Sequence, residues 1–155
     1  MWALPELIEA AVRSGNPRMA GDALARLTDA AQAGGTDFGL GIKARSHALL
    51  SKGARAECLY REAVDRLGRT QLRPELARAH LLYGEWLRRE NRRADARAQL
   101  RTAHELLSAL GMQAFAERAR RERQATGEKA RKRTAETASL LTAQEASIAR
   151  LACDG

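Results

Sequence analysis

The residue types that most often carry catalysis or bind metal ions stand apart from one another in this chain. His47, His80 and His104 fall in three different helical stretches, and none has a second ligand three or four residues away. No serine or cysteine stands in a nucleophile elbow or beside a recognisable base. The glycine-rich stretch GGTDFGLGIK, residues 34–43, lacks the glycine spacing and the hydroxyl after lysine that a phosphate-binding loop needs. We therefore expect no enzyme activity and no cofactor in this chain.

Basic side chains that could contact phosphate gather between residues 117 and 139. This segment holds eight Lys or Arg against four Glu and almost no large apolar residue, so it cannot form core. One interpretation is a solvated helix end followed by a charged linker. The other is an arm that binds nucleic acid by releasing counterions. Its candidate phosphate contacts are Arg118, Arg121, Lys129, Arg131, Lys132 and Arg133.

The last sixteen residues contain a helix-start signal. Thr142 and Glu145 have the spacing of a capping box, in which the hydroxyl and the carboxylate each satisfy a free backbone N–H group. Ile148 and Leu151 then fall on one side of the helix that this box would open. The pattern predicts a short amphipathic helix at the C-terminal end.

Length and composition restrict the fold that must position these residues. The chain has 155 residues, 4% aromatic residues and a net charge of +8, and no stretch alternates apolar and polar residues as a strand would. Two cysteines do not make a disulfide framework, and we expect Cys58 to be a small buried residue. No apolar segment is long enough to span a bilayer, and no export signal is recognisable. These features predict an all-α, cytoplasmic protein without a membrane partner.

Apolar periodicity predicts seven helices, the most regular of which are two in residues 74–110 separated by a turn at Asn91. In the first of the two, Tyr83 and Trp86 lie on the apolar face as core anchors, and Arg78 and Glu85 lie on the polar face. The other five are expected within residues 4–15, 16–35, 36–53, 54–68 and 113–124, with ends marked mainly by glycine, asparagine and proline.

A small–large–small pattern recurs on every second helix. It is formed by Ala23, Leu27 and Ala30, then Ala56, Tyr60 and Ala63, then Ala96, Leu100 and Ala103. Intervals of 33 and 40 residues are typical of helical-hairpin repeats, and the third copy resembles the tetratricopeptide repeat. The resemblance implies stacked antiparallel hairpins in a right-handed array. It also implies that the first helix of each hairpin lines a concave groove, with Arg45, His80 and Glu85 as its candidate residues.

A second resemblance covers nearly the whole chain. LTAQEASIARLACDG, residues 141–155, resembles the opening of a LuxR-type helix-turn-helix domain, and residues 77–107 and 114–122 resemble the repeat region of the large ATP-binding LuxR-type regulators of actinobacteria. This implies a transcription regulator whose parent protein binds ATP and DNA through domains that this chain lacks. The chain stops at the glycine that precedes the recognition helix in that family.

The sequence thus predicts three parts: a repeat domain at residues 1–126, a basic linker at 127–139 and a truncated helix-turn-helix start at 140–155. The expected function is a regulatory and protein-interaction module that couples an effector or partner to a DNA-binding domain. The alternative is a fragment that binds nucleic acid non-specifically through residues 118–133.

The C-terminal helix also yields a prediction about self-association. A helix this short is marginal in water unless its apolar side packs against another surface. Ile148 and Leu151 could pack on the repeat array of the same chain or on a second copy of the chain, and of the two we expect the second copy. Sedimentation should then show a larger particle for the whole chain than for residues 1–139, and equal monomers would contradict the prediction.

Overall fold

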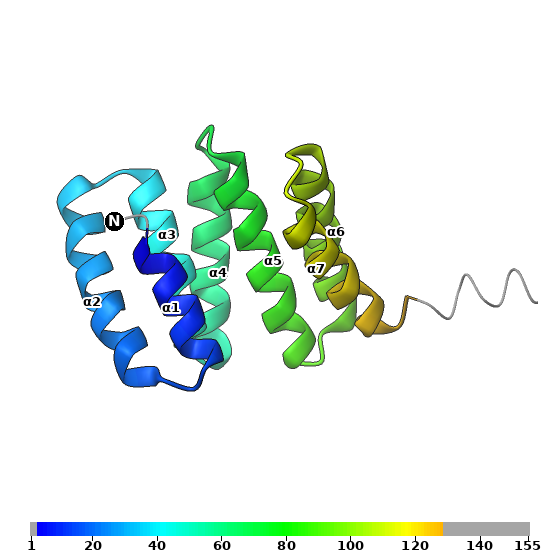
Figure 1. Cartoon of the computed structure of the whole chain (residues 1–155), viewed down its shortest axis with the longest axis horizontal. Coiled ribbons are helices and arrows are strands. Elements are labelled where there is room, and N and C mark those ends of the chain that lie inside the picture. The colour runs from blue at the N-terminus through cyan, green and yellow to red at the C-terminus, as the bar shows by residue number, and fades with distance from the viewer. Residues whose placement is uncertain (1–2, 129–155) are drawn as a thin grey trace, which may run out of the picture.

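The computed structural model describes residues 3–128, and these form seven α-helices and no strand (Figure 1). The helices are α1 (Ala3–Arg13), α2 (Pro17–Gly34), α3 (Asp37–Leu49), α4 (Gly53–Gly68), α5 (Arg73–Arg89), α6 (Arg93–Ala109) and α7 (Gln113–Arg123), followed by a π-helical turn, η1 (Gln124–Glu128). The all-helical prediction is confirmed. The linker residues Lys129, Arg131, Lys132 and Arg133, the predicted C-terminal helix with Thr142, Glu145, Ile148 and Leu151, and the self-association predicted for it lie outside the described residues.

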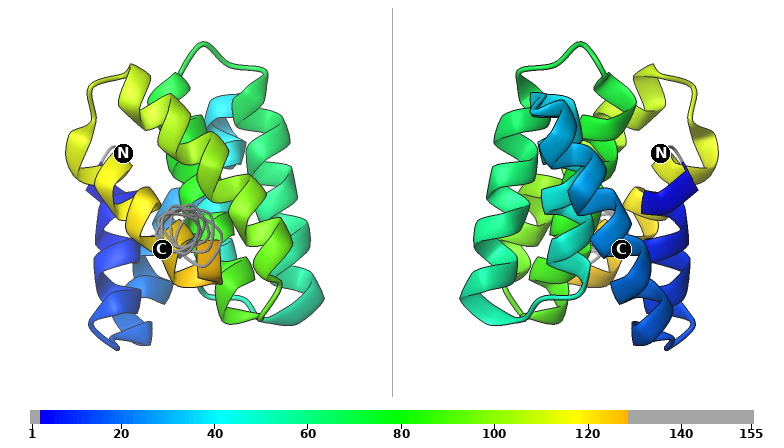
Figure 2. Two further views of the ribbon diagram at one scale, coloured as in Figure 1. Left: turned by 90° about the vertical axis from the view of Figure 1, so that its right-hand side faces the viewer. Right: turned by 90° about the vertical axis from the view of Figure 1, so that its left-hand side faces the viewer.

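Consecutive helices pair as antiparallel hairpins, and the hairpins stack side by side. The pairs α1/α2, α3/α4 and α5/α6 pack internally, and α7 packs on α6 at the end of the array. The first helices of the hairpins also touch in order, α1 with α3, α3 with α5 and α5 with α7. Figure 2, which looks along the long axis, places α1 and α7 on the same side of the molecule. The first helices and α7 therefore form one curved layer, and α2, α4 and α6 form a second. We call the side of the first layer that faces away from the second the inner face.

Local signals set the helix ends as the sequence predicts. The Asn16 side chain accepts a hydrogen bond from the Met19 N–H group (3.1 Å), and the Thr36 hydroxyl accepts one from the Gly39 N–H group (3.1 Å), which caps α2 and α3. Asn91 takes a left-handed conformation with φ of 62°, as expected for the turn between α5 and α6.

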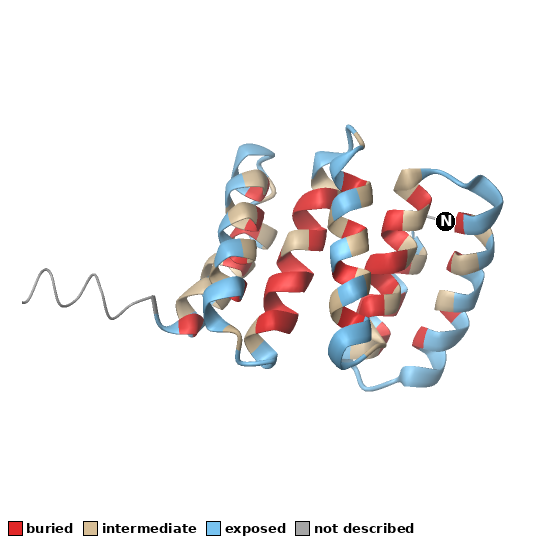
Figure 3. Cartoon of the chain, turned by 180° about the vertical axis from the view of Figure 1, so that it is seen from behind, coloured by how far each residue is buried: buried red, intermediate tan, exposed pale blue. Residues whose placement is uncertain are grey.

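The core lies between the two layers and is largest around α5, which is buried along most of its length (Figure 3). The rings of Tyr60, Tyr83 and Trp86 pack together, with centroids 5.4 to 6.1 Å apart. The predicted role of Tyr83 and Trp86 as core anchors is confirmed. The repeated alanines of α4 and α6 are fully buried. Leu100 packs against Gly84 within its hairpin, and Tyr60 packs against Tyr83 and Trp86 of the next one. The small–large–small pattern therefore marks contacts both within and between hairpins.

Two expected core residues are exposed instead. Leu110 continues the apolar spacing of the second predicted helix in residues 74–110, but it is 40% exposed because it lies just beyond the end of α6. Cys58 is exposed because it lies on the side of α4 that faces solvent. In both cases helical spacing alone placed the residue near the apolar stripe, whereas the neighbouring helix does not reach it.

Glycine allows the closest approach between two helices of one hairpin. A Cβ atom at Gly84 of α5 would lie 2.6 Å from Cγ of Leu100 and 3.2 Å from the backbone nitrogen of Leu100 on α6. That nitrogen cannot move without shifting α6. Gly21 of α2, by contrast, has no such neighbour within 4 Å of an added Cβ atom.

These two glycines form a matched pair for a stability test. Gly84→Ala should lower the free energy of unfolding by about 1–3 kcal/mol, because the methyl group overpacks the contact with α6. Gly21→Ala should raise it by roughly 0.5–1 kcal/mol, because alanine is the better helix former and meets no obstacle. Urea denaturation of both variants measures the difference. Equal changes in the free energy of unfolding would show that α5 and α6 do not approach closely at Gly84.

Candidate functional site

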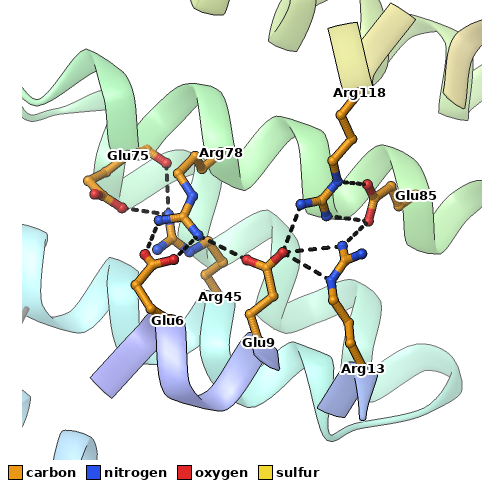
Figure 4. A network of polar contacts seen from close by, with 8 residues as sticks. All are labelled: Glu6, Glu9, Arg13, Arg45, Glu75, Arg78, Glu85 and Arg118. Carbon is orange, nitrogen blue, oxygen red and sulfur yellow. Dashed lines mark hydrogen bonds and ion pairs between the residues drawn. The ribbon is translucent and has the colours of Figure 1, made fainter. Parts of the chain in front are cut away.

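Eight charged side chains from α1, α3, α5 and α7 meet on the inner face (Figure 4). We call them the inner network. They are Glu6, Glu9 and Arg13 of α1, Arg45 of α3, Glu75, Arg78 and Glu85 of α5, and Arg118 of α7. Four glutamates thus face four arginines, and every first helix contributes at least one of them.

Glu9 joins three helices through its carboxylate. One oxygen accepts hydrogen bonds from Arg118 Nη1 of α7 (2.8 Å) and from Arg13 Nε (3.2 Å), and the other accepts one from Arg78 Nη2 of α5 (2.9 Å). The residue is only 8% exposed. A buried carboxylate needs such partners because losing its hydration is unfavourable.

Glu85 is the second link to α7. Its two oxygens accept hydrogen bonds from Nε (2.5 Å) and Nη2 (2.8 Å) of Arg118, a bidentate arrangement that fixes the guanidinium in orientation as well as position. Arg13 Nη2 adds a third contact at 3.1 Å. Arg118 therefore ties α7 to both α1 and α5.

The other end of the inner network joins α1, α3 and α5. Arg78 pairs with both oxygens of Glu6, and its guanidinium also lies over the Phe115 ring, 5.1 Å from the centroid. Arg45 is 2% exposed and donates to the Glu75 carboxylate (2.7 Å) and to the Glu75 carbonyl oxygen (3.2 Å). Burial lowers the pKa of Arg45, and the charge of Glu75 opposes this shift.

Burial also shifts the acidity of Glu85. Removal from water raises the pKa of its carboxyl group to about 7, although the neighbouring Arg13 favours the charged form. Glu9 and Glu122 add to the upward shift through like-charge repulsion. A carboxyl group inside the inner network therefore gains or loses its proton near neutral pH.

A cavity of about 530 Å³ adjoins the inner network at the C-terminal ends of α1, α3 and α5. We call it the inner groove, and its lining consists of Glu9, Val12, Arg13, Ala48, Leu49, Ser51, Lys52, Tyr60, Glu85, Trp86, Arg89 and Glu90. Its volume is in the range of ligand-binding clefts. Glu9, Arg13 and Glu85 belong to both the groove and the inner network, so the two are physically continuous.

The three predicted groove residues, Arg45, His80 and Glu85, differ in burial and in the groups that they contact. Arg45 and Glu85 do lie on first helices, but both are buried in ion pairs within the chain and are not free side chains of an open surface. The expectation that Arg78 and Glu85 occupy an exposed polar face of α5 is wrong, because α1 and α7 cover that face. His80 does not point to the inner groove, because its Nδ1 lies 2.7 Å from Oε1 of Gln99 on α6.

Of the predicted phosphate contacts, two are described. Arg118 is paired with Glu9 and Glu85 in the inner network, so a phosphate group would have to compete with these two carboxylates for it. Arg121 is largely exposed, and its Nε lies 3.6 Å from the Glu117 carboxylate. An exposed pair of this kind is weak and leaves Arg121 accessible.

The described part of the chain offers no group of histidine, cysteine and acidic residues arranged to hold a metal ion. No helix within residues 3–128 combines the length and apolar character required to cross a membrane. A scan against models of known protein families, a search of curated proteins and a search of solved structures found no match to the chain.

The raised pKa of Glu85 predicts a pH dependence of stability. The folded state holds this proton up to about pH 7 and the unfolded state only to about pH 4.5, so Glu85 makes the free energy of unfolding fall as pH rises between these values. Glu85→Gln removes this contribution to the fall in the free energy of unfolding, a contribution of at most about 1.4 kcal/mol per pH unit. Urea denaturation between pH 5 and 7.5 should therefore show a steeper decline for the natural chain than for the variant.

Glu57→Gln is the matched control for this measurement. Hydrogen bonding from Arg92 lowers the pKa of Glu57, so this group contributes stability that is lost only as pH falls below about 4.5. Between pH 5 and 7.5 its variant should run parallel to the natural chain. If the free energy of unfolding of Glu85→Gln also changed with pH in parallel with that of the natural chain, Glu85 would be ionised in the folded protein.

Proposed function

We propose that this chain is a regulatory interaction module of a cytoplasmic transcription regulator of the LuxR type, and that it is not an enzyme. A partner or effector bound at the inner face would alter the ion pairs of Arg118 and so the position of α7. The observation that carries this proposal is that one side chain of α7 contacts Glu9 of α1 and Glu85 of α5 at once.

The position of α7 in the chain gives this contact its significance. Glu9 and Arg118 are 109 residues apart in sequence, so their ion pair connects the first helix of the array to the last. The basic linker at 127–139 and the stretch that resembles a helix-turn-helix start come after α7 in the sequence. A change at the inner face can therefore reach the C-terminal segment through α7 without unfolding the array.

The energies involved are large enough for such coupling. Removing one partner from a buried ion pair costs about 3–5 kcal/mol, because the other charge remains unpaired. Coupling between two sites in regulated proteins is typically about 1–3 kcal/mol. The cost of breaking one buried ion pair therefore exceeds the coupling free energy that regulation requires. An occupant that weakens the contacts of Arg13 or Glu85 without breaking all of them would be sufficient.

Non-specific binding to nucleic acid is less well supported. Arg118 is committed to Glu9 and Glu85, and binding phosphate would leave both buried carboxylates without this partner. Arg121 is exposed, but one accessible arginine does not make a phosphate-binding surface. Binding to duplex DNA with a steep salt dependence would favour this alternative.

The coupling can be tested by neutralising Glu9 on α1. Glu9→Gln should increase amide hydrogen exchange in residues 113–123 of α7 by at least about fivefold, because α7 loses a charged contact that holds it to α1. Glu62→Gln is the control, since Glu62 pairs with Arg66 on α4 outside the inner network (2.7 Å). An unchanged rate in α7 of the Glu9 variant would contradict the coupling.

A reporter assay tests the regulatory role separately. The promoters that flank the gene for this chain can be fused to a reporter and measured with the natural chain and with Glu9→Gln. We expect at least one promoter to respond to the natural chain and to respond differently to the variant. If no promoter responds, the role in transcription is contradicted, whereas the coupling within the array is judged by hydrogen exchange alone.

A further inference from the structure

We propose that the inner groove is a binding site for organic carboxylates with an apolar body. The inference rests on the proposed function, because it names the chemical class that the inner face would sense. It is carried by the shape and lining of the groove, an unpartnered hydroxyl group and the uncommitted charges at its rim.

The walls of the groove suit an apolar body. Val12 of α1 and Leu49 of α3 line it with only partly buried side chains, and Trp86 of α5 contributes its indole. Six of the twelve lining residues are charged, so the apolar part of the wall is confined to these three side chains with Ala48 and Tyr60. A cavity of about 530 Å³ can accept an aromatic or branched aliphatic group with its polar end.

Tyr60 supplies a hydrogen-bond donor without an acceptor. Its side chain lines the groove, its hydroxyl is buried, and that hydroxyl has no hydrogen-bond partner among the described residues. Burial raises the pKa of Tyr60, so the phenol keeps its proton and acts as a donor. Buried hydroxyl groups are rarely left unpaired. Because Tyr60 is fully buried, an oxygen atom of a bound molecule would satisfy this hydroxyl once the side chains that cover it move aside.

The charges at the rim favour an anion. Lys52 and Arg89 are exposed, and neither forms an ion pair within residues 3–128. Glu9 and Glu85 are already neutralised by arginines of the inner network, which leaves Glu90 as the uncommitted acid of the groove. The uncommitted lining residues therefore carry a net positive charge.

The remaining acid of the same groove decides which anion fits. Glu90 lines the groove without a neutralising arginine within residues 3–128, and its repulsion penalises a dianion such as a phosphate monoester more than a singly charged group. A carboxylate carries one charge and still offers two acceptor oxygens. A free small acid and the terminal carboxylate of a peptide share this chemistry, and the experiment separates them.

Titration followed by amide NMR tests the proposal on the whole chain. The free-acid probe is 4-phenylbutyrate, with 4-phenylbutyramide and 4-phenylbutylamine as uncharged and cationic controls of the same shape. The peptide probe is N-acetyl-Ala-Leu-Phe with a free terminal carboxylate, with its terminal amide as control. We expect each carboxylate to bind at least about tenfold more tightly than its amide, with shifts at residues 48–52 and 85–90.

The relative affinities of the two carboxylates identify the source. Tighter binding of 4-phenylbutyrate indicates a small-molecule acid, and tighter binding of the tripeptide indicates a peptide partner; both outcomes support the carboxylate site. Three outcomes would overturn the carboxylate site. They are tighter binding of the amine, shifts confined to α2, α4 and α6, or no binding of any probe at 10 mM, which is about the weakest affinity that such a titration detects.

Variants test whether the named groups make the site. Replacing both Lys52 and Arg89 with Gln should weaken carboxylate binding about tenfold and leave binding of the amide unchanged. Tyr60→Phe should weaken carboxylate binding and raise the melting temperature, because it removes an unsatisfied buried hydroxyl. Tyr83→Phe is its matched control: the Tyr83 hydroxyl contacts Arg61 and Glu57 away from the groove, so carboxylate affinity should not change.

The outcome is separable from that of the proposed function. Unchanged carboxylate affinity in the Lys52 and Arg89 double variant, or in Tyr60→Phe, would overturn the assignment of the site even if Glu9→Gln loosens α7. Conversely, carboxylate binding without any effect of Glu9→Gln on α7 would support a binding site and contradict its coupling to α7.

Discussion

The arrangement of this protein depends on keeping two glutamates charge-balanced away from water. Glu9 and Glu85 are 8% and 5% exposed, and their carboxylates lie among guanidinium groups from three helices. A buried charge without partners would cost several kcal/mol, so α1, α5 and α7 have a narrow range of relative positions in which these contacts survive. Arg118 is central because it is the residue of α7 that meets both carboxylates.

The packing of the hairpins brings these charges together. Alanines at the repeated positions of α4 and α6, and Gly84 on α5, let neighbouring helices approach closely. Close stacking in turn places the first helices side by side in one layer. The charged residues of that layer then face a shared space instead of bulk water, and each glutamate finds an arginine from another helix. The apolar contacts set the geometry, and the ion pairs depend on it.

The inner face combines a rigid contact with a responsive one. Arg118 and Glu85 form a bidentate pair, which holds α7 in a defined orientation. Glu85 also borders the inner groove, and burial raises its pKa to about 7, so its charge is sensitive to what occupies the groove and to pH near neutrality. Under the proposed function, an occupant of the inner groove would compete for Glu85 while Arg118 holds α7.

The amino-acid sequence by itself determined the helices, their ends and the residues that pack between hairpins. Periodic apolar residues, capping side chains and turn-forming residues such as Asn16, Thr36 and Asn91 act over a few positions, so they can be read locally. The role of Arg78, Glu85 and Arg118 could not be read in this way. On a helix, a charged face that meets water has the same spacing as one that meets another charged helix. Only the tertiary structure, by laying α1 and α7 over α5, decided that these side chains are buried and paired, and that Tyr60 lines a groove.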